Sequence, residues 1–250
     1  MSLVEPDVAR ERTASPEETG PGPAVASRGP ADRVPASRMV PIAPEGWPFI
    51  AIALGLGLGL YWLGGRKAAA LGLALAGFMA VFFRDPERHP PDVAGAVLAP
   101  ADGRVMDVRA EVLDPFVGRA QQVSIFLSPL DVHVNRSPIA GEGAGVEYRS
   151  GAFLPAYRAD ASELNERTTV TIQGDRMRVV VRQIAGVLAR RVVCRVRTGD
   201  RLAAGERFGI IRFGSRADVV LPHEVRISVR PGDRVRAGET ILGVLEGELR

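Results

Sequence analysis

Hydrophobic and polar positions divide the chain into three parts. Residues 1–44 are rich in Pro, Ala, Glu and Arg and lack any apolar periodicity, which is typical of a disordered tail. Two apolar runs follow, 48–64 and 68–83, separated by a short charged step at 65–67. From about 97 to 245, short β-type segments alternate with Gly, Pro and Asp. The pattern predicts a tail (1–44), a hydrophobic hairpin (45–84) and a β-rich domain (85–250).

The two apolar runs predict a hairpin that spans or enters a membrane. Each has 16 to 17 residues, or roughly 25 Å as a helix, which is the lower limit for crossing a bilayer. A buried helical pair is the alternative, but runs so poor in charge and so rich in Gly, Ala and Leu favour the membrane. Trp47 and Trp62 lie where interfacial aromatic residues are expected. Arg84 and Arg88 favour a cytoplasmic exit, although the two basic residues of the turn count against it.

A sequence repeat lies inside the β-rich part. Residues 198–206 (TGDRLAAGE) are echoed by residues 231–239 (PGDRVRAGE), and a strand-like segment follows each copy. Both the Gly-Asp step and the Ala-Gly-Glu step favour tight turns. We therefore expect a mainly β (α+β) fold, a flattened β-barrel or sandwich resembling biotinyl and lipoyl modules, preceded by the hydrophobic helical hairpin.

Composition excludes several kinds of chemistry. The single cysteine, Cys194, allows no intramolecular disulfide and no cysteine-cluster metal site. His89, His133 and His223 are too scattered for a zinc-ligand pattern, so we expect no metal. Lys67 is the only lysine and falls in the hairpin turn. The β-rich part therefore has no lysine to bind pyridoxal phosphate, biotin or lipoate.

Charge is concentrated in one stretch of an otherwise mildly basic chain. The net charge is +3, but residues 167–201 hold nine arginines against two acidic residues. These arginines either lie on solvated strand faces or form a surface for anionic lipid headgroups. A nucleic-acid partner is not expected, because no binding motif accompanies the charge.

The segment around Gly214-Ser215 carries the most informative chemistry. A Gly-Ser pair alone is typical of an ordinary turn. Taken with six other motifs in the same order, however, the segment resembles the processing site of the short bacterial phosphatidylserine decarboxylases. The other motifs are Gly46-Trp47-Pro48-Phe49, Phe82-Phe83-Arg84-Asp85-Pro86-Glu87-Arg88, Ala99-Pro100-Ala101-Asp102-Gly103, Phe126-Leu127-Ser128-Pro129-Leu130-Asp131-Val132-His133-Val134-Asn135-Arg136, Asn165-Glu166-Arg167 and Gln183-Ile184-Ala185-Gly186.

This resemblance implies an enzyme that cleaves itself. Ser215 Oγ attacks the carbonyl of Gly214 and converts the amide into an ester; elimination and hydrolysis then release ammonia and leave a pyruvoyl group at residue 215. A preceding glycine suits this step because it lets the backbone adopt strained conformations. The products, chains 1–214 and 215–250, form a heterodimer. The pyruvoyl ketone replaces pyridoxal phosphate as the cofactor and forms a Schiff base with the substrate amine.

The resemblance also supplies candidates for the base that activates Ser215. A histidine can titrate near neutrality and act in proton transfer, which makes His133 one candidate, and Asp102 could orient a histidine and stabilise its charge. Many longer family members carry a second histidine three positions after the first, whereas this chain has Arg136 there. Either His133 serves both self-cleavage and turnover, or Arg136 binds the phosphate or carboxylate of the lipid together with His133.

The expected function is decarboxylation of phosphatidylserine to phosphatidylethanolamine and CO2, in phospholipid biosynthesis at the cell membrane, with the catalytic domain on the cytoplasmic side. Two alternatives remain open. One is a non-enzymatic, membrane-tethered adaptor with a barrel-sandwich module, which would stay a single chain. The other is a related pyruvoyl decarboxylase for a soluble amino acid, which the hairpin makes less favourable.

Overall fold

The computed structural model describes residues 41–158, 160–187, 192–212, 215–245 and 247. The tail expected at 1–44 therefore lies outside the described residues except for its last four. Among these, Ala43 is fully buried, and its N–H donates to the carbonyl of Phe83 at 2.7 Å. Ile42 forms an antiparallel bridge with Arg84. Residues 41–44 thus belong to the folded part, because they pair with the end of the hairpin.

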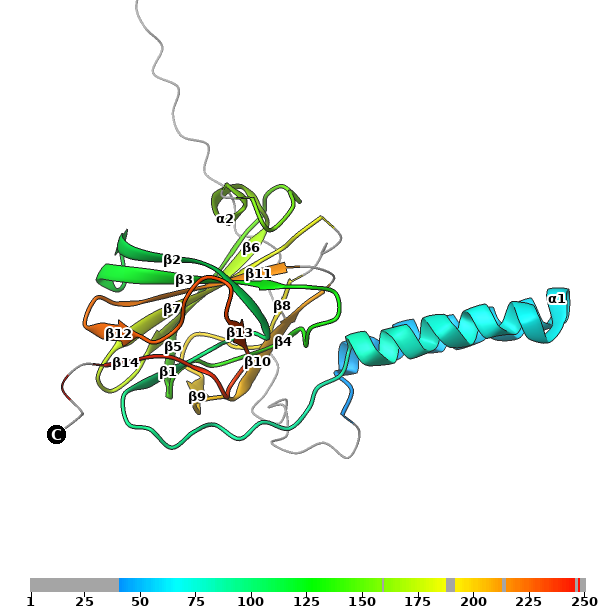
Figure 1. Ribbon diagram of the computed structural model, residues 1–250, viewed down its shortest axis with the longest axis horizontal. Coiled ribbons are helices and arrows are strands. Elements are labelled where there is room, and N and C mark those ends of the chain that lie inside the picture. The colour runs from blue at the N-terminus through cyan, green and yellow to red at the C-terminus, as the bar shows by residue number, and fades with distance from the viewer. Residues whose placement is uncertain (1–40, 159, 188–191, 213–214, 246, 248–250) are drawn as a thin grey trace, which may run out of the picture. The chain divides into compact units, whose positions relative to one another are not determined.

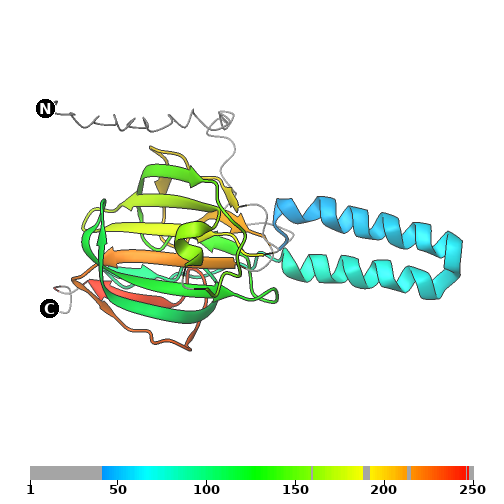
Figure 2. The same cartoon turned by 90° about the horizontal axis from the view of Figure 1, so that it is seen from above.

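The expected hydrophobic hairpin is confirmed. A short 3₁₀ turn, η2 (Pro44–Gly46), leads into α1 (Trp47–Phe82), which is bent into two helical arms at Gly65, where φ is 68° and ψ is −161°. The arms lie side by side and antiparallel (Figure 2). They meet at small residues, since a Cβ added to Gly72 would lie only 2.2 Å from the Cα of Gly57. This close approach requires glycine at position 72, and an added Cβ on Gly57 would also be tight, 3.2 Å from the Cα of Gly72.

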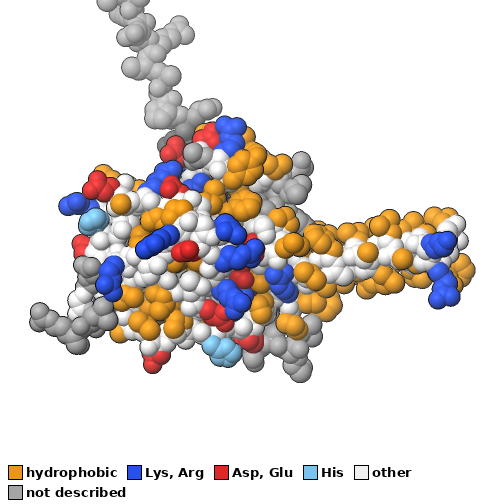
Figure 3. Space-filling model, in the orientation of Figure 1, with side chains coloured by type: hydrophobic (Ala, Val, Ile, Leu, Met, Phe, Trp, Pro, Cys, Tyr) orange, Lys and Arg blue, Asp and Glu red, His pale blue; other side chains and the backbone are white. Residues whose placement is uncertain are grey.

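The outward surface of the hairpin is apolar. By length and composition, the segment Pro44–Phe82 could cross a membrane, with a mean hydropathy of 1.6 and only 11% of the apolar window buried. Hydrophobic side chains cover the arms, and basic side chains gather at the turn (Figure 3). Those at the turn are the exposed Arg66 and Lys67.

The rest of the described chain forms antiparallel β-sheet, with one short helix, α2 (Ala161–Leu164). The strands are β1 (Ala96–Leu98), β2 (Gly103–Asp114), β3 (Gly118–Leu127), β4 (Val134–Arg136), β5 (Gly141–Arg149), β6 (Arg167–Gln173), β7 (Arg178–Ile184), β8 (Val192–Cys194), β9 (Arg201–Leu202), β10 (Arg207–Ile211), β11 (Ser215–Pro222), β12 (Val225–Ile227), β13 (Arg234–Val235) and β14 (Ile241–Leu245).

These strands build one large sheet and two small ones. The large sheet has the order β13-β2-β3-β11-β7-β6-β5-β9, and the small sheets have the orders β4-β10-β8 and β1-β14-β12. The large sheet curls like half a barrel (Figure 1). The mainly β fold with a preceding helical hairpin is thus confirmed.

Alternation along β11 separates two faces of the large sheet. Ala217, Val219 and Leu221 pack into the main hydrophobic core, whereas the residues between them face the other way. β11 lies between β3 and β7, so both of its edges are hydrogen-bonded. Ser215 is the first residue of this central strand, and it pairs with β3 one residue before the pairing with β7 begins.

The sequence repeat corresponds to two copies of the same turn. In each copy an Asp side chain accepts a backbone N–H from three residues earlier, Asp200 from Arg197 at 2.9 Å and Asp233 from Arg230 at 2.8 Å. The two copies also touch, since a Cβ added to Gly238 would lie 3.3 Å from the Cα of Gly205. The repeat therefore joins β9–β10 to β13–β14.

Candidate active site

Ser215 is buried, and its hydroxyl has no partner. The residue is 0% exposed, and Ser215 Oγ makes no hydrogen bond within the described part of the chain. Its backbone pairs with Leu127 of β3. A buried hydroxyl without a hydrogen bond lowers the stability of the fold. A role of the Ser215 hydroxyl in a reaction would explain why a serine occupies this position. Gly214, the other residue of the expected cleavage site, lies outside the described residues.

His133 lies at the end of the loop that connects β3 to β4, and this loop begins after Leu127, the partner of Ser215. After Leu127 the chain turns, with Ser128 N–H donating to Asp131 Oδ2 at 2.8 Å. The chain then enters β4, where the His133 carbonyl accepts the N–H of Ile211 at 3.2 Å. Position 127 is thus tied to 215, and position 133 to 211. The segments 127–133 and 211–215 are therefore joined at both ends, by the Leu127–Ser215 pair and by the His133–Ile211 hydrogen bond.

The surroundings of His133 fix its tautomer. Nδ1 lies 2.9 Å from the backbone carbonyl of Asp131, which can only accept, so the proton is assigned to Nδ1. Nε2 is buried and has no hydrogen-bond partner among the described residues. Burial lowers the pKa of His133 from 6.5 to about 4. At neutral pH, His133 is therefore uncharged and presents the Nε2 lone pair as a proton acceptor.

The base of the hairpin covers this histidine. The ring of Phe82, the last residue of α1, lies with its centroid 4.1 Å from the centroid of the His133 ring. Phe82 and Phe83 form a buried cluster with Val132 and Val134, which flank His133. The hairpin thus contributes directly to the desolvation of the histidine.

Asp102 forms its described hydrogen bonds with groups other than His133, and its expected orienting role stays a prediction. Its Oδ2 pairs with Arg88 Nη2 at 2.8 Å, and its Oδ1 accepts the N–H of Ala237 at 2.8 Å. Burial raises the pKa of Asp102, against the opposing effects of the Ala237 N–H and Arg88. His133 Nδ1 is bonded instead to the backbone carbonyl of Asp131. A sequence motif does not reveal a partner of this kind, because every residue has a backbone carbonyl. Asp102 instead ties the second repeat turn to the segment after the hairpin.

Arg136, expected to bind the lipid, is buried and hydrogen-bonded within the chain. Its side chain is 5% exposed and donates to the carbonyls of Gly205 at 3.0 Å and Pro86 at 2.8 Å, and to Asp85 at 3.3 Å. Burial lowers the pKa of Arg136 to about 10, and the neighbouring Arg207 adds to this effect. A guanidinium held in this way supports the loop after the hairpin.

Two amides near Ser215 had no role assigned from the sequence. Gln183 Nε2 donates to Asn135 Oδ1 at 2.8 Å, and both side chains are 0% exposed. Asn135 Nδ2 donates in turn to the Pro100 carbonyl at 3.3 Å. Both residues belong to motifs quoted above, but only the tertiary structure joins them. Together they link the large sheet to the small sheet β4-β10-β8.

Comparison with known proteins identifies the family. The family model for phosphatidylserine decarboxylase matches residues 75–243. A phosphatidylserine decarboxylase proenzyme of Mycobacteroides abscessus is 48% identical over 215 residues, which is 84% of this chain and 90% of that protein. Another, of Symbiobacterium thermophilum, is 53% identical over 210 residues, which is 82% of this chain and 95% of that protein. The chain belongs to the phosphatidylserine decarboxylase family.

A second buried polar cluster in this family member lies behind Ser215. Arg216 faces the opposite side of the large sheet, where it donates to Asp218 Oδ1 at 2.6 Å and to Ser124 Oγ at 2.9 Å. Asp218 also accepts from Ser162 Oγ of α2 at 2.6 Å. The cluster anchors the start of β11 on the face that Ser215 does not occupy.

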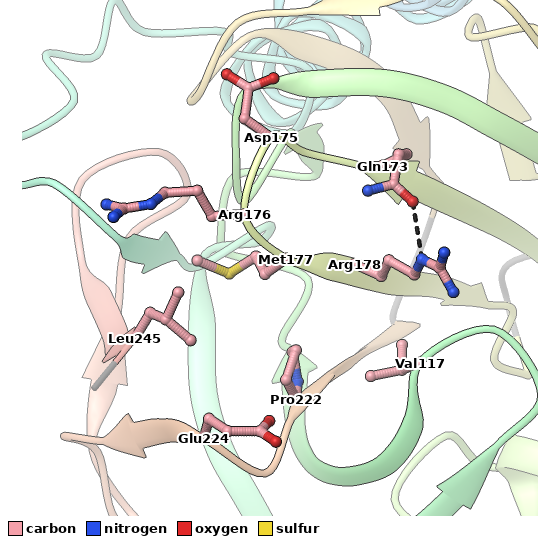
Figure 4. Close-up of a pocket in the computed structure, with 9 residues that line it drawn as sticks. All are labelled: Val117, Gln173, Asp175, Arg176, Met177, Arg178, Pro222, Glu224 and Leu245. Carbon is pink, nitrogen blue, oxygen red and sulfur yellow. Dashed lines mark hydrogen bonds between the residues drawn. The ribbon is translucent and has the colours of Figure 1, made fainter. Parts of the chain in front are cut away.

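A surface pocket of about 390 Å³ lies away from these residues (Figure 4). Its lining includes Pro222, at the opposite end of β11 from Ser215, together with Arg178 and Glu224. The strand spans eight residues, so its two ends lie roughly 23 Å apart. Within the described ranges, no group of three His, Cys, Asp or Glu side chains could hold a metal ion.

Proposed function

We propose that this member of the phosphatidylserine decarboxylase family converts phosphatidylserine to phosphatidylethanolamine and CO2, using a pyruvoyl group formed from its own Ser215. The observation that carries the proposal is the buried Ser215 Oγ without a partner, at the start of a central strand. The relatives are named proenzymes, which fits an inactive precursor that is cleaved.

Self-processing would begin at Ser215. Its hydroxyl oxygen attacks the Gly214 carbonyl, the bond to the amide nitrogen breaks, and an ester joins the two parts. Removal of the Ser215 Cα proton expels the Gly214 carboxylate and leaves a dehydroalanine at position 215. Addition of water and loss of ammonia then give the pyruvoyl group, with chains 1–214 and 215–250 as products. His133 Nε2 is the proposed proton acceptor, because it is unprotonated at neutral pH and has no other described partner.

The fold would keep the two products together. β11 pairs with β3 along all eight of its residues, and with β7 from Arg216 to Val220. Arg216 is also bonded to Ser124 on β3. Residue 215 therefore stays in the sheet after cleavage, which supports a heterodimer of the two products.

The site fits a pyruvoyl group. Such a group supplies a conjugated carbonyl that accepts the electrons released when CO2 leaves an amine-linked substrate. The buried position of Ser215 excludes bulk water, and the buried, unpartnered Nε2 of His133 supports its proposed role in moving protons. Lys67 is the only lysine, so the described β domain offers no amine for the alternative cofactor, pyridoxal phosphate.

The substrate headgroup would enter at the base of the hairpin. An apolar hairpin that inserts into the membrane brings its base to the level of the lipid headgroups. Arg84 lies there, bonded to the carbonyls of Val81 at 2.7 Å and Leu130 at 2.6 Å, and Arg212 lies over the ring of Phe49. We propose that these two arginines, in place of Arg136, meet the anionic headgroup, on the cytoplasmic side of the cell membrane.

Intact mass spectrometry tests the proposal. The purified wild-type protein should give two chains separated at Gly214-Ser215, with the smaller chain blocked to Edman sequencing because its N-terminus is a ketone. Ser215→Ala should remain one chain without activity. An uncleaved wild-type protein would instead support the adaptor alternative. Decarboxylation of free serine, but not of phosphatidylserine vesicles, would support the soluble amino-acid alternative.

A further inference from the structure

The orientation of the Gln183 amide is fixed by a chain of hydrogen bonds. The Pro100 carbonyl can only accept, so the nitrogen of Asn135 must point toward it. Asn135 Oδ1 is then the atom that faces Gln183, and it accepts from Gln183 Nε2. Gln183 Oε1 therefore points elsewhere, as a hydrogen-bond acceptor. It is buried and has no partner among the described residues.

This acceptor lies on the same face of the sheet as Ser215. Gln183 of β7 is directly opposite Ala217 of β11, and Ser215 is two residues before Ala217. Side chains two residues apart on a strand share a face. Diagonal neighbours of this kind lie about 7–8 Å apart, with their Cβ atoms somewhat closer, and a glutamine side chain can reach across this distance. The unpartnered Oε1 and the unpartnered Ser215 Oγ thus belong to neighbouring side chains.

Packing holds the amide in place from the other side. Gly209 of β10 lies over it so closely that a Cβ there would be 2.7 Å from Gln183 Nε2. With Asn135 at one end and Gly209 above, the amide has little freedom to rotate. A rigid acceptor beside a nucleophile is typical of a residue that orients the nucleophile.

We propose that Gln183 is a positioning residue for self-processing: a rotation of the Ser215 side chain, whose Oγ is unpaired in the structure, brings the hydroxyl into a hydrogen bond with Gln183 Oε1 before cleavage. This inference rests on the proposed function. An amide oxygen is too weak a base to take the proton, so Gln183 selects the orientation of Oγ and leaves proton removal to His133. The alternative is that Gln183 only bridges the two sheets through Asn135.

The test follows the rate of cleavage into chains 1–214 and 215–250 by intact mass in three variants. Gln183→Met removes the acceptor and the bridge, and should slow cleavage about tenfold or more. Asn135→Leu removes the bridge but keeps the acceptor, and should slow cleavage clearly less than Gln183→Met. Gln183→Glu keeps an acceptor, and its buried acid group in the protonated form can still donate to Asn135, so it should restore cleavage relative to Gln183→Met.

Gln122→Met is the matched control, because Gln122 is a buried glutamine of the same sheet whose amide bonds to Ser124 and Asp218. It should cleave at close to the wild-type rate. Melting temperatures of all variants in a Ser215→Ala background show whether each one folds. Normal cleavage of Gln183→Met, or equal slowing by Gln183→Met and Asn135→Leu, overturns this inference alone. An uncleaved wild-type chain overturns the proposed function, and this inference with it.

Discussion

The ring of Phe82 covers the ring of His133, with the two planes inclined by 32°. Phe82 ends the apolar hairpin, and His133 is the residue proposed to activate Ser215. The apolar hairpin and the part of the chain proposed to do chemistry are therefore in direct contact. Their contact explains why the histidine is desolvated and which changes to the hairpin should affect processing.

His133→Ala should accumulate the uncleaved chain, with cleavage slowed by about 100-fold or more, because an unassisted serine hydroxyl is a poor nucleophile. Asp102→Asn serves as the comparison. Since Asp102 pairs with Arg88 and Ala237 and not with His133, this variant should lose thermal stability but cleave within a few fold of the wild-type rate. Time courses by intact mass measure both rates. Slow cleavage in a stably folded Asp102→Asn would restore its expected catalytic role.

The depressed pKa of His133 predicts acid sensitivity. Since the folded pKa of about 4 lies below the ordinary 6.5, the unfolded chain takes up a proton that the folded chain does not. Stability should therefore fall as the pH falls through 6.5 toward 4, by about 2 kcal/mol at pH 5 relative to pH 8 from this group. Denaturant unfolding of Ser215→Ala, with and without His133→Asn, isolates this contribution. An identical pH dependence in both proteins would contradict it.

Arg136→Ala should destabilise the fold by about 2–4 kcal/mol, because it removes one partner of the buried Asp85 and the bonds to two carbonyls. The exposed Arg149, whose ion pair with Glu147 spans 3.5 Å, offers a control that should cost less than about 0.5 kcal/mol. Thermal unfolding of both variants makes the comparison. If Arg136→Ala were fully stable but had a raised KM for phosphatidylserine, the lipid-binding role would be the better explanation.

Gly72→Ala should loosen the hairpin, because its new Cβ would meet the backbone of Gly57 at 2.2 Å. The cost of such overpacking is about 1–3 kcal/mol. Gly59→Ala is the matched control, since nothing lies within 4 Å of its added Cβ and alanine is the better helix former. Circular dichroism at 222 nm during heating in detergent reports mainly on α1. Equal melting of the two variants would argue against close packing of the arms.

Replacing residues 55–74 with a short Gly-Ser turn should release the protein from membranes but leave cleavage intact, because Phe82 and Phe83 still cover His133. Deleting residues 46–83 should instead also impair cleavage, since it uncovers the histidine. Sedimentation with membranes and intact mass distinguish the two effects. Full turnover of bilayer substrate by the shortened protein would remove the need for membrane insertion.

The sequence by itself determined the hairpin and the β-rich domain, and it singled out Ser215 for the proposed chemistry. Apolar runs around a glycine turn specify paired helices through local properties, and Gly65 bends the chain at the expected step. The order of the motifs identified the family. Each motif is a run of adjacent residues, so it can be recognised without knowledge of the fold. The lack of lysine outside the hairpin turn limited the cofactor chemistry for the same reason, since composition does not depend on folding.

Only the tertiary structure decided how the side chains are paired. Arg136, expected to face a lipid, bonds with Asp85, 51 positions away, and Asp102 bonds with the backbone of Ala237, 135 positions away. The acceptor on Gln183 depends on Asn135, which lies on another strand of another sheet. Such partners are set by strand order and register, and burial then fixes each protonation state and each amide orientation. These quantities arise from contacts between distant segments, which no local pattern of residues records.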